Sequence, residues 1–316
     1  MNATQTILEM PAQNKTDLAG ELAGCLSRDT AVRRDEPLAK HTTLRVGGPA
    51  DVYVEPASEM DLAGIVKFCG ARGVPFFVIG RGSNLLVRDG GFRGVMICLA
   101  HANFSRIEVD GERLRCGAGA RLKNVAVEAR RSGLSGVEFL EGIPGSVGGA
   151  LRMNAGAMGG QTFDVVESVR LMDFDGNIRE LAPQAMAVAY RHCAALKDRI
   201  ALGAVFKCQS APRGEIETRM KAFSEKRWAS QPAAPSAGCL FKNPAQIPAG
   251  QLMDELGLKG TRIGGAVVSA EHGNFIVNDG TATARNILNL IDLLKQRAKV
   301  ERGIELETEV EIIGEG

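Results

Sequence analysis

Hydrophobic residues in the first part of the chain fall into short alternating or continuous runs, which is the pattern of β-strands. Six such runs, separated by Gly, Asp and Asn residues typical of turns, lie at 52–54, 75–79, 85–87, 95–99, 107–109 and 113–116. Apolar residues recur at helical spacing over 16–28, 59–72 and about 121–132. Further strands are expected at 169–172 and 201–206. Because few helices interrupt the strands, the pattern predicts an α+β fold rather than a regular alternation of strand and helix.

A polar joint at 210–214, rich in turn formers, separates this region from a more helical one. A charged helix is expected from 215 to about 228. The last long helix begins near Thr281, and Gly303 stands where a glycine that ends a helix is expected. A final strand is expected at 304–313.

The 316 residues, 45% of them hydrophobic, suffice for two domains with a core each. We expect an N-terminal helical segment at 1–40, a first domain at 41–209 and a second at 214–316. The net charge of +1 provides no global field that would attract nucleic acid or anionic lipid. Apolar runs such as 74–79 are too short to span a bilayer, and 1–15 lacks the layout of a signal peptide. A cytoplasmic protein without nucleic-acid or membrane partners is expected, and its oligomeric state stays open.

Cysteine and histidine spacing indicates neither a disulfide framework nor a metal site. The seven cysteines are an odd set without any Cys-x-x-Cys pair, and all but Cys239 are expected to be small buried hydrophobic residues. His41, His192 and His272 have no metal-ligand spacing, so hydrogen-bonded structural roles are expected for them.

The segment Gly-Arg-Gly-Ser-Asn at 80–84 follows an apolar strand directly, so its backbone N–H groups are able to approach a phosphate closely. A lone Gly-x-Gly is also common in ordinary turns. The third glycine of a Rossmann fingerprint would fall on Leu85, and no P-loop sequence occurs. Because a strand rather than a helix is expected from Leu85 onward, the backbone amides of the turn would have to carry a phosphate charge.

A second glycine-rich segment, 142–160, holds seven glycines among nineteen residues. So many glycines cost conformational entropy on folding, which favours close approach to a flat or phosphorylated ligand over an ordinary loop.

Several motifs follow one another at characteristic places. They are TTLRVGG at 42–48, GRGSN at 80–84, IPGSVGGALRMNAG at 143–156, Tyr190-Arg191, GCLFKNP at 238–244, the segment 263–278, and 306–314. Together they resemble the UDP-N-acetylenolpyruvoylglucosamine reductase family along nearly the whole chain, from about His41 to Gly314.

The resemblance implies an FAD-binding domain of the vanillyl-alcohol-oxidase type at 41–209 and a C-terminal α+β substrate domain at 214–316. It implies NADPH-dependent reduction of UDP-N-acetyl-3-O-(1-carboxyvinyl)-glucosamine to UDP-N-acetylmuramate, a step of peptidoglycan precursor synthesis. Neither glycine segment contains His or Cys, so FAD is expected to bind noncovalently. Tyr53 and Tyr190 are the only tyrosines, so the chain is similar to the shorter form of the family, which lacks an added tyrosine loop.

The cofactor-binding residues that the resemblance implies lie in the two glycine segments. They are Gly80, Arg81, Gly82, Ser83 and Asn84 at the pyrophosphate, and Ile143, Pro144, Gly145, Ser146, Gly148, Gly149, Asn154 and Gly156 along the flavin.

Three catalytic residues are implied in the same way: Arg191, Cys239 and Glu309. Hydride addition to an enolpyruvyl ether pushes negative charge into its carboxylate, which calls for a cation such as Arg191. Spacing alone leaves Glu307 and Glu309 as alternatives, and the resemblance selects Glu309.

Cys239 stands where the family usually has serine, and a thiol with an ordinary pKa of about 8.5 is mainly protonated at neutral pH. We therefore predict that Cys239 is the general acid, with Ser236 or a water as the alternative.

Tyr190, Lys242 and Asn243 are expected to bind the substrate's sugar or phosphates. Glu311 stands where relatives often have arginine. Two other readings remain: a flavin enzyme of the same fold that acts on a hydroxy acid or alcohol, and a flavin- or sugar-nucleotide-binding protein without catalysis.

Overall fold

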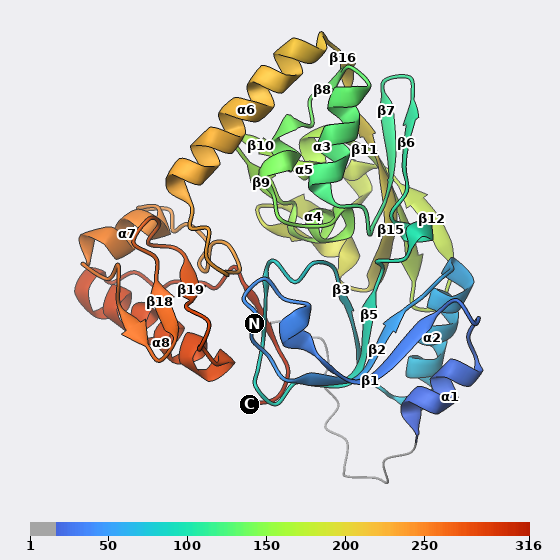
Figure 1. The fold of residues 1–316 in the computed structure, drawn as a ribbon, viewed down its shortest axis with the longest axis horizontal. Coiled ribbons are helices and arrows are strands. Elements are labelled where there is room, and N and C mark those ends of the chain that lie inside the picture. The colour runs from blue at the N-terminus through green and yellow to red at the C-terminus, as the bar shows by residue number, and fades with distance from the viewer. Residues whose placement is uncertain (1–16) are drawn as a thin grey trace.

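The computed structural model describes residues 17–316 (Figure 1). The predictions for 1–15, and for the start of the first helix at residue 16, lie outside the described residues.

The first sheet is mixed and has the strand order β1-β2-β5-β3. Its strands and the helices beside it are α1 (Leu18–Gly24), β1 (Ala31–Pro37), β2 (Pro49–Glu55), α2 (Glu59–Arg72), β3 (Phe76–Ile79) and β5 (Phe92–Cys98). Strand β5 runs parallel to β2 and β3, and β1 is antiparallel to β2. Helix α2 begins where the Ser58 side chain accepts a hydrogen bond from the Asp61 amide, and it ends at the left-handed Gly73.

Strand β1 corrects the expectation that 1–40 is a helical segment. Its sequence, AVRRDEP, carries no clear apolar alternation. Pairing with β2 at the edge of the sheet stabilises it, and this is tertiary information that a local pattern lacks.

The second sheet is fully antiparallel, in the order β12-β11-β15-β7-β6. Its strands are β6 (Ile107–Asp110), β7 (Arg113–Gly117), β11 (Val166–Asp173), β12 (Ile178–Leu181) and β15 (Arg199–Lys207). The helices that accompany it are α3 (Leu122–Arg131), α4 (Val147–Met153) and α5 (Thr162–Val165). Helix α4 occupies part of the glycine segment 142–160, where no helix was predicted, because Val147, Ala150 and Leu151 are buried in the core.

Helices dominate the C-terminal region, which lies to one side of both sheets in Figure 1. Its elements are α6 (Arg213–Ser230), α7 (Ala249–Glu255), β17 (Arg262–Ile263), β18 (Ala266–Val268), β19 (Ile276–Asn278) and α8 (Ala284–Arg302). Helix α8 begins with a capping box between Thr283 and Asn286. It ends at Gly303, as predicted, and this glycine is left-handed with φ of 66°.

The predicted strand at 304–313 is wrong for most of its length. Only β20 (Glu311–Ile313) is a strand, and it pairs in parallel with β4 (Leu85–Val87) of the N-terminal region. Before it, the backbone bonds to another part of the C-terminal region: Glu307 O accepts from Lys242 N at 2.9 Å, and Glu309 N donates to Leu240 O at 2.7 Å. The last ten residues therefore run between the two regions.

The core of the C-terminal region also includes Leu44, Val46 and Leu86, which come from the N-terminal region. The remaining short strands are β8 (Leu134–Ser135), β9 (Gly156–Ala157), β10 (Gly160–Gln161), β13 (Val188–Ala189), β14 (His192–Cys193) and β16 (Gln209–Ser210). Packing across the junction of the two regions fixes the walls of the cleft between them.

Candidate active site

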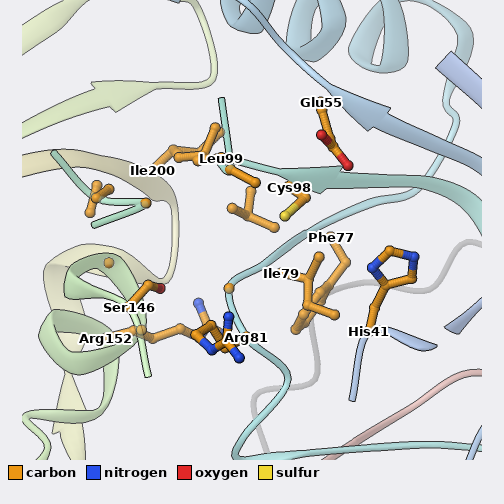
Figure 2. A pocket seen from close by; sticks show the side chains of 18 of the residues that line it. His41, Glu55, Phe77, Ile79, Arg81, Cys98, Leu99, Ser146, Arg152 and Ile200 are labelled. Carbon is orange, nitrogen blue, oxygen red and sulfur yellow. The ribbon is translucent and has the colours of Figure 1, made fainter. Parts of the chain in front are cut away.

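Two cavities adjoin along the junction of the two sheets and the C-terminal region. Their volumes are about 560 and 610 Å³. The residues that line both are Thr42, Thr43, Phe77, Val78, Ile79, Gly80, Arg81, Ser146, Gly149 and Arg152. Figure 2 shows the first cavity, with Ser146, Arg81 and Arg152 on one side and His41, Glu55 and Cys98 on another. Because they share a wall, the cavities form one elongated cleft.

In the loop at 80–84, Gly80 and Arg81 line both cavities, and the position of Gly82 requires glycine. Gly82 has φ of +57°, and a Cβ there would lie 2.2 Å from the carbonyl oxygen of His41. A Cβ on Gly80 would lie 2.6 Å from Oγ of Ser146. At Gly80 and Gly82 the loop backbone therefore lies at the cavity wall without a covering Cβ, so a phosphate would meet backbone amides there in addition to the side chains of the wall.

Asn84, at the end of this loop, holds the C-terminal segment in place. Its Nδ2 donates to the carbonyl of Glu309 at 3.1 Å, and its own carbonyl accepts from the amide of Glu311 at 3.1 Å. The side chain predicted to bind the cofactor thus positions the segment that carries Glu309.

Most of the second glycine segment lies where it was expected. Residues 143–146, Gly149 and Gly156 line the second cavity, and Gly148 lines the first. Asn154 lines neither cavity: it is buried, it ends α4 with φ of 39°, and its amide bonds to Gln161 and to the backbone of Phe163. Asn154 was predicted to lie beside the flavin, but here it stabilises the end of α4 behind the cleft. Its short polar side chain fits the left-handed turn at that position.

Arg191, Cys239 and Glu309 come together in the second cavity. Nε of Arg191 donates to Oε1 of Glu309 at 2.8 Å, and these side chains are only 20% and 14% exposed. Arg191 has φ of +54°, an unusual conformation for a residue with a side chain, and its guanidinium lies 4.8 Å from the ring centre of Tyr190. A Cβ on Gly156 would lie 3.4 Å from Nη1 of Arg191, so the guanidinium reaches the second glycine segment.

Burial determines the protonation of the two other groups. Burial and, to a lesser extent, the nearby Glu309 carboxylate together raise the pKa of the Cys239 thiol to about 12, against the opposing effect of Arg191. Burial also raises the pKa of Glu309 above its ordinary value, although Arg191 and Lys242 oppose that shift. The thiol is therefore a protonated hydrogen donor at neutral pH.

Position in the cleft distinguishes Glu309 from its alternative Glu307, but it does not distinguish Cys239 from its alternative Ser236. Glu307 is exposed and pairs with Nζ of Lys242 at 2.5 Å, outside both cavities, whereas Glu309 lines the second cavity. Ser236 lines the same cavity as Cys239.

The three residues expected to bind the substrate line neither cavity. Tyr190 is exposed, Lys242 pairs with Glu307, and Oδ1 of Asn243 accepts from the backbone amide of Ala249 at the start of α7. Asn243 thus has a local structural partner, and Lys242 acts on the site through its charge near Glu309.

Four side chains of the cleft were absent from the predicted set. Arg152, which lines both cavities, pairs at 2.9 Å with Glu311, which lines the second cavity. Arg227 and Trp228 of α6 also line the second cavity. A charge inside the otherwise apolar sequence GALRMNAG was the available signal for Arg152. Trp228 is 60% exposed near the end of a charged helix, and no sequence signal indicated that it lines the cleft.

Five of the six cysteines expected to be buried are buried, and two of the three histidines, His41 and His272, form the expected hydrogen bonds. All seven cysteines are free, but Cys25 is exposed rather than buried, since it follows the end of the short helix α1 at the surface. His41 bonds to Glu36 at 2.9 Å, and Nδ1 of His272 accepts from the Asn274 amide. Within residues 17–316, no group of three metal-ligating side chains occurs, and no helix is long and apolar enough to cross a membrane.

The cleft suits a dinucleotide, since it has two chambers, a backbone loop for phosphates between them, and Arg81 and Arg152 at the shared wall. Residues 50–182 match the family model for an FAD binding domain, and residues 231–313 match the UDP-N-acetylenolpyruvoylglucosamine reductase C-terminal domain. Fold and site thus define an FAD-dependent oxidoreductase.

Comparison with whole proteins narrows this class. The UDP-N-acetylenolpyruvoylglucosamine reductase of Clostridioides difficile is 42% identical over 96% of this chain and 99% of its own. That of Heliobacterium modesticaldum is 45% identical over 89% of this chain and 90% of its own. The crystal structure of the Thermus caldophilus enzyme superposes with a TM-score of 0.78 at 38% identity, over 90% of this chain and 98% of that one. The chain belongs to the UDP-N-acetylenolpyruvoylglucosamine reductase family, which confirms the predicted family, α+β fold and FAD cofactor.

Proposed function

We propose that this protein reduces the enolpyruvyl ether of UDP-N-acetyl-3-O-(1-carboxyvinyl)-glucosamine to UDP-N-acetylmuramate, with NADPH as the reductant. The observation that carries the proposal is the meeting of Arg191, Cys239 and Glu309 at one end of the FAD cleft. A cytoplasmic location, without nucleic-acid or membrane partners, belongs to the same proposal.

The bound FAD would supply the redox chemistry, by accepting hydride from NADPH and passing it to the terminal vinyl carbon. The protein has to stabilise the negative charge that this addition places on the substrate's carboxyl end. Because Nε of Arg191 donates to Glu309, its two Nη groups are left to donate to the substrate's carboxylate. The ion pair fixes the guanidinium before substrate arrives, so little reorganisation is needed as charge develops.

The adjoining carbon of the substrate then needs a proton, and Cys239 is the donor in this proposal. Its raised pKa keeps the thiol protonated until an electron-rich carbon is present. The thiolate left behind lies near the Arg191 cation, whose charge favours it. Ser236 lines the same cavity and is the alternative donor.

Steady-state NADPH oxidation tests the proposed function. We expect oxidation that depends on the UDP-linked enol ether and yields UDP-N-acetylmuramate, with no turnover of hydroxy acids or alcohols. Oxidation driven only by a hydroxy acid or alcohol would assign the site to another flavin enzyme of this fold. No NADPH oxidation with any of these substrates would leave a flavin-binding protein without catalysis.

A further inference from the structure

Arg152 lies at the point where the two cavities meet, and its side chain lines both. It projects from the last turn of α4, directly after the residues that run along the cleft. Nη1 donates to the carbonyl of Leu196 at 3.0 Å, and Nη2 donates to Oε1 of Glu311 at 2.9 Å. These two bonds fix the plane of the guanidinium, and in residues 17–316 it forms no other hydrogen bond. Donors therefore remain for a ligand in the cleft.

Arg81 brings a second positive charge to the same place. Arg81, like Arg152, lines both cavities, and the two guanidinium groups overlap in the view of Figure 2. Arg81 is exposed, and in the described part of the chain it forms neither a hydrogen bond nor an ion pair. Two arginines line the same wall and the Glu311 carboxylate pairs with one of them, which leaves a local excess of positive charge. Such a cluster matches the two negative charges of a pyrophosphate.

Among residues 17–316, Glu311 is the carboxylate that pairs with Arg152, and the backbone holds it there. Its amide donates to the carbonyl of Asn84, the last residue of the phosphate loop. Its side chain is 34% exposed, the same as that of Arg152, so the pair is accessible from the cleft. Glu311 thus orients Arg152, while its negative charge opposes any anion that binds beside it.

We propose that Arg152, together with Arg81, binds the pyrophosphate of FAD through its side chain, and that Glu311 is a positioning residue that lowers the affinity for FAD. The phosphate charge is then met by two arginines in addition to the backbone amides of the loop. The inference concerns the binding of FAD alone, so it holds or fails independently of the substrate proposed above.

Titration of the apoprotein with FAD, followed by quenching of flavin fluorescence, tests the inference. Arg152→Gln should weaken FAD binding by about tenfold to a hundredfold, which is typical of a lost charge-assisted hydrogen bond. It should also reduce the dependence of the FAD dissociation constant on salt. Binding of ADP, measured by calorimetry, should weaken in parallel, because ADP carries the same pyrophosphate without the flavin.

Glu311→Gln gives the opposite and more diagnostic result. Glutamine keeps an oxygen that accepts from Arg152 but removes the negative charge, so FAD should bind about threefold to tenfold more tightly. Glu315→Gln and Arg179→Gln, which change equivalent charges outside both cavities, serve as matched controls and should leave the affinity for FAD unchanged.

The UDP-sugar and NADPH also contain a pyrophosphate that Arg152 could bind instead. The KM values of the FAD-loaded enzyme for these two substrates, compared with the affinity of the apoprotein for FAD, distinguish the three ligands. Unchanged FAD and ADP affinity in Arg152→Gln, with a raised KM for the UDP-sugar or NADPH, would overturn the assignment to FAD. Equal or weaker FAD binding in Glu311→Gln would overturn the role given to Glu311. Far-ultraviolet circular dichroism of each apoprotein establishes that a loss of binding does not come from unfolding.

Discussion

At the scale of single residues, the cleft combines groups whose protonation is set by burial and by one ion pair. Cys239 and Glu309 both have raised pKa values, and Arg191 opposes both shifts. The thiol therefore holds its proton, and Glu309 ionises less readily than an exposed glutamate. Sequence reasoning reached these residues only through a family resemblance, since an arginine, a cysteine and a glutamate so far apart in the chain carry no local signal.

Replacing Cys239 separates its role in proton transfer from cofactor reduction. Cys239→Ala should leave bleaching of the flavin by NADPH intact and slow its reoxidation by the enol ether by about a hundredfold or more. Cys239→Ser keeps an exchangeable proton and should retain more activity than alanine. Anaerobic stopped-flow absorbance follows both steps. Normal reoxidation in the alanine variant would transfer the role to Ser236 or to water.

Glu309→Gln should separate stability from activity. Because the pKa of Glu309 is raised in the folded state, its contribution to stability is complete below the ordinary glutamate pKa and is lost as pH rises through the raised value. Urea unfolding should therefore show that the variant gains stability relative to wild type as pH rises above the ordinary glutamate value of 4.5. Turnover should fall by about a hundredfold or more, since the charge that orients Arg191 is lost. A variant that becomes less stable relative to wild type over this pH range would contradict the direction of the shift.

At the scale of elements, local signals predicted those with clear ends and apolar faces. Helix α2 and strand β4 have the predicted bounds, because a serine cap and a left-handed glycine delimit the first and turn residues delimit the second. Strand β1 and helix α4 were missed because partners distant in sequence stabilise them against weak local propensity. Residues 304–310 were predicted as a strand from their local pattern. They do not form one, because their backbone bonds at Glu307 and Glu309 to the loop at Leu240 and Lys242 instead of to a neighbouring strand.

The phosphate loop gives a prediction with a matched control. Gly82 and Gly73 have similar φ values, +57° and +63°, but a Cβ meets the His41 backbone only at Gly82. Gly73→Ala should cost about 1 kcal/mol, the typical penalty for alanine in a left-handed position. Gly82→Ala should cost more in thermal or urea unfolding and should also lose FAD on purification. Equal stability and equal FAD content in the two variants would contradict the geometry of the loop.

At the scale of the whole molecule, the C-terminal segment connects the cofactor loop to the C-terminal region. Strand β20 pairs with β4, and Asn84 bonds to the backbone on both sides of Val310. Arg152 and Glu311, 159 residues apart, meet only because of this pairing. Long-range pairing of that kind is why the sequence did not reveal the charged junction of the cleft.

Leu86 tests the mechanical connection between the regions. It lies on β4 but is fully buried in the core of the C-terminal region. Leu86→Ala should cost about 2–5 kcal/mol, the usual range for a buried leucine, whereas the exposed Met60→Ala should cost little. Because the cores interlock, we expect one cooperative transition in calorimetry. Two transitions, with only one shifted by Leu86→Ala, would show that the regions unfold independently.

The most direct measurement is the colour of the purified protein under anaerobic conditions. We predict a yellow protein whose absorbance bleaches on addition of NADPH and returns, without oxygen, on addition of the UDP-linked enol ether, in proportion to the UDP-N-acetylmuramate formed. A flavin that bleaches with NADPH but stays reduced in the presence of that enol ether would contradict the proposed reaction.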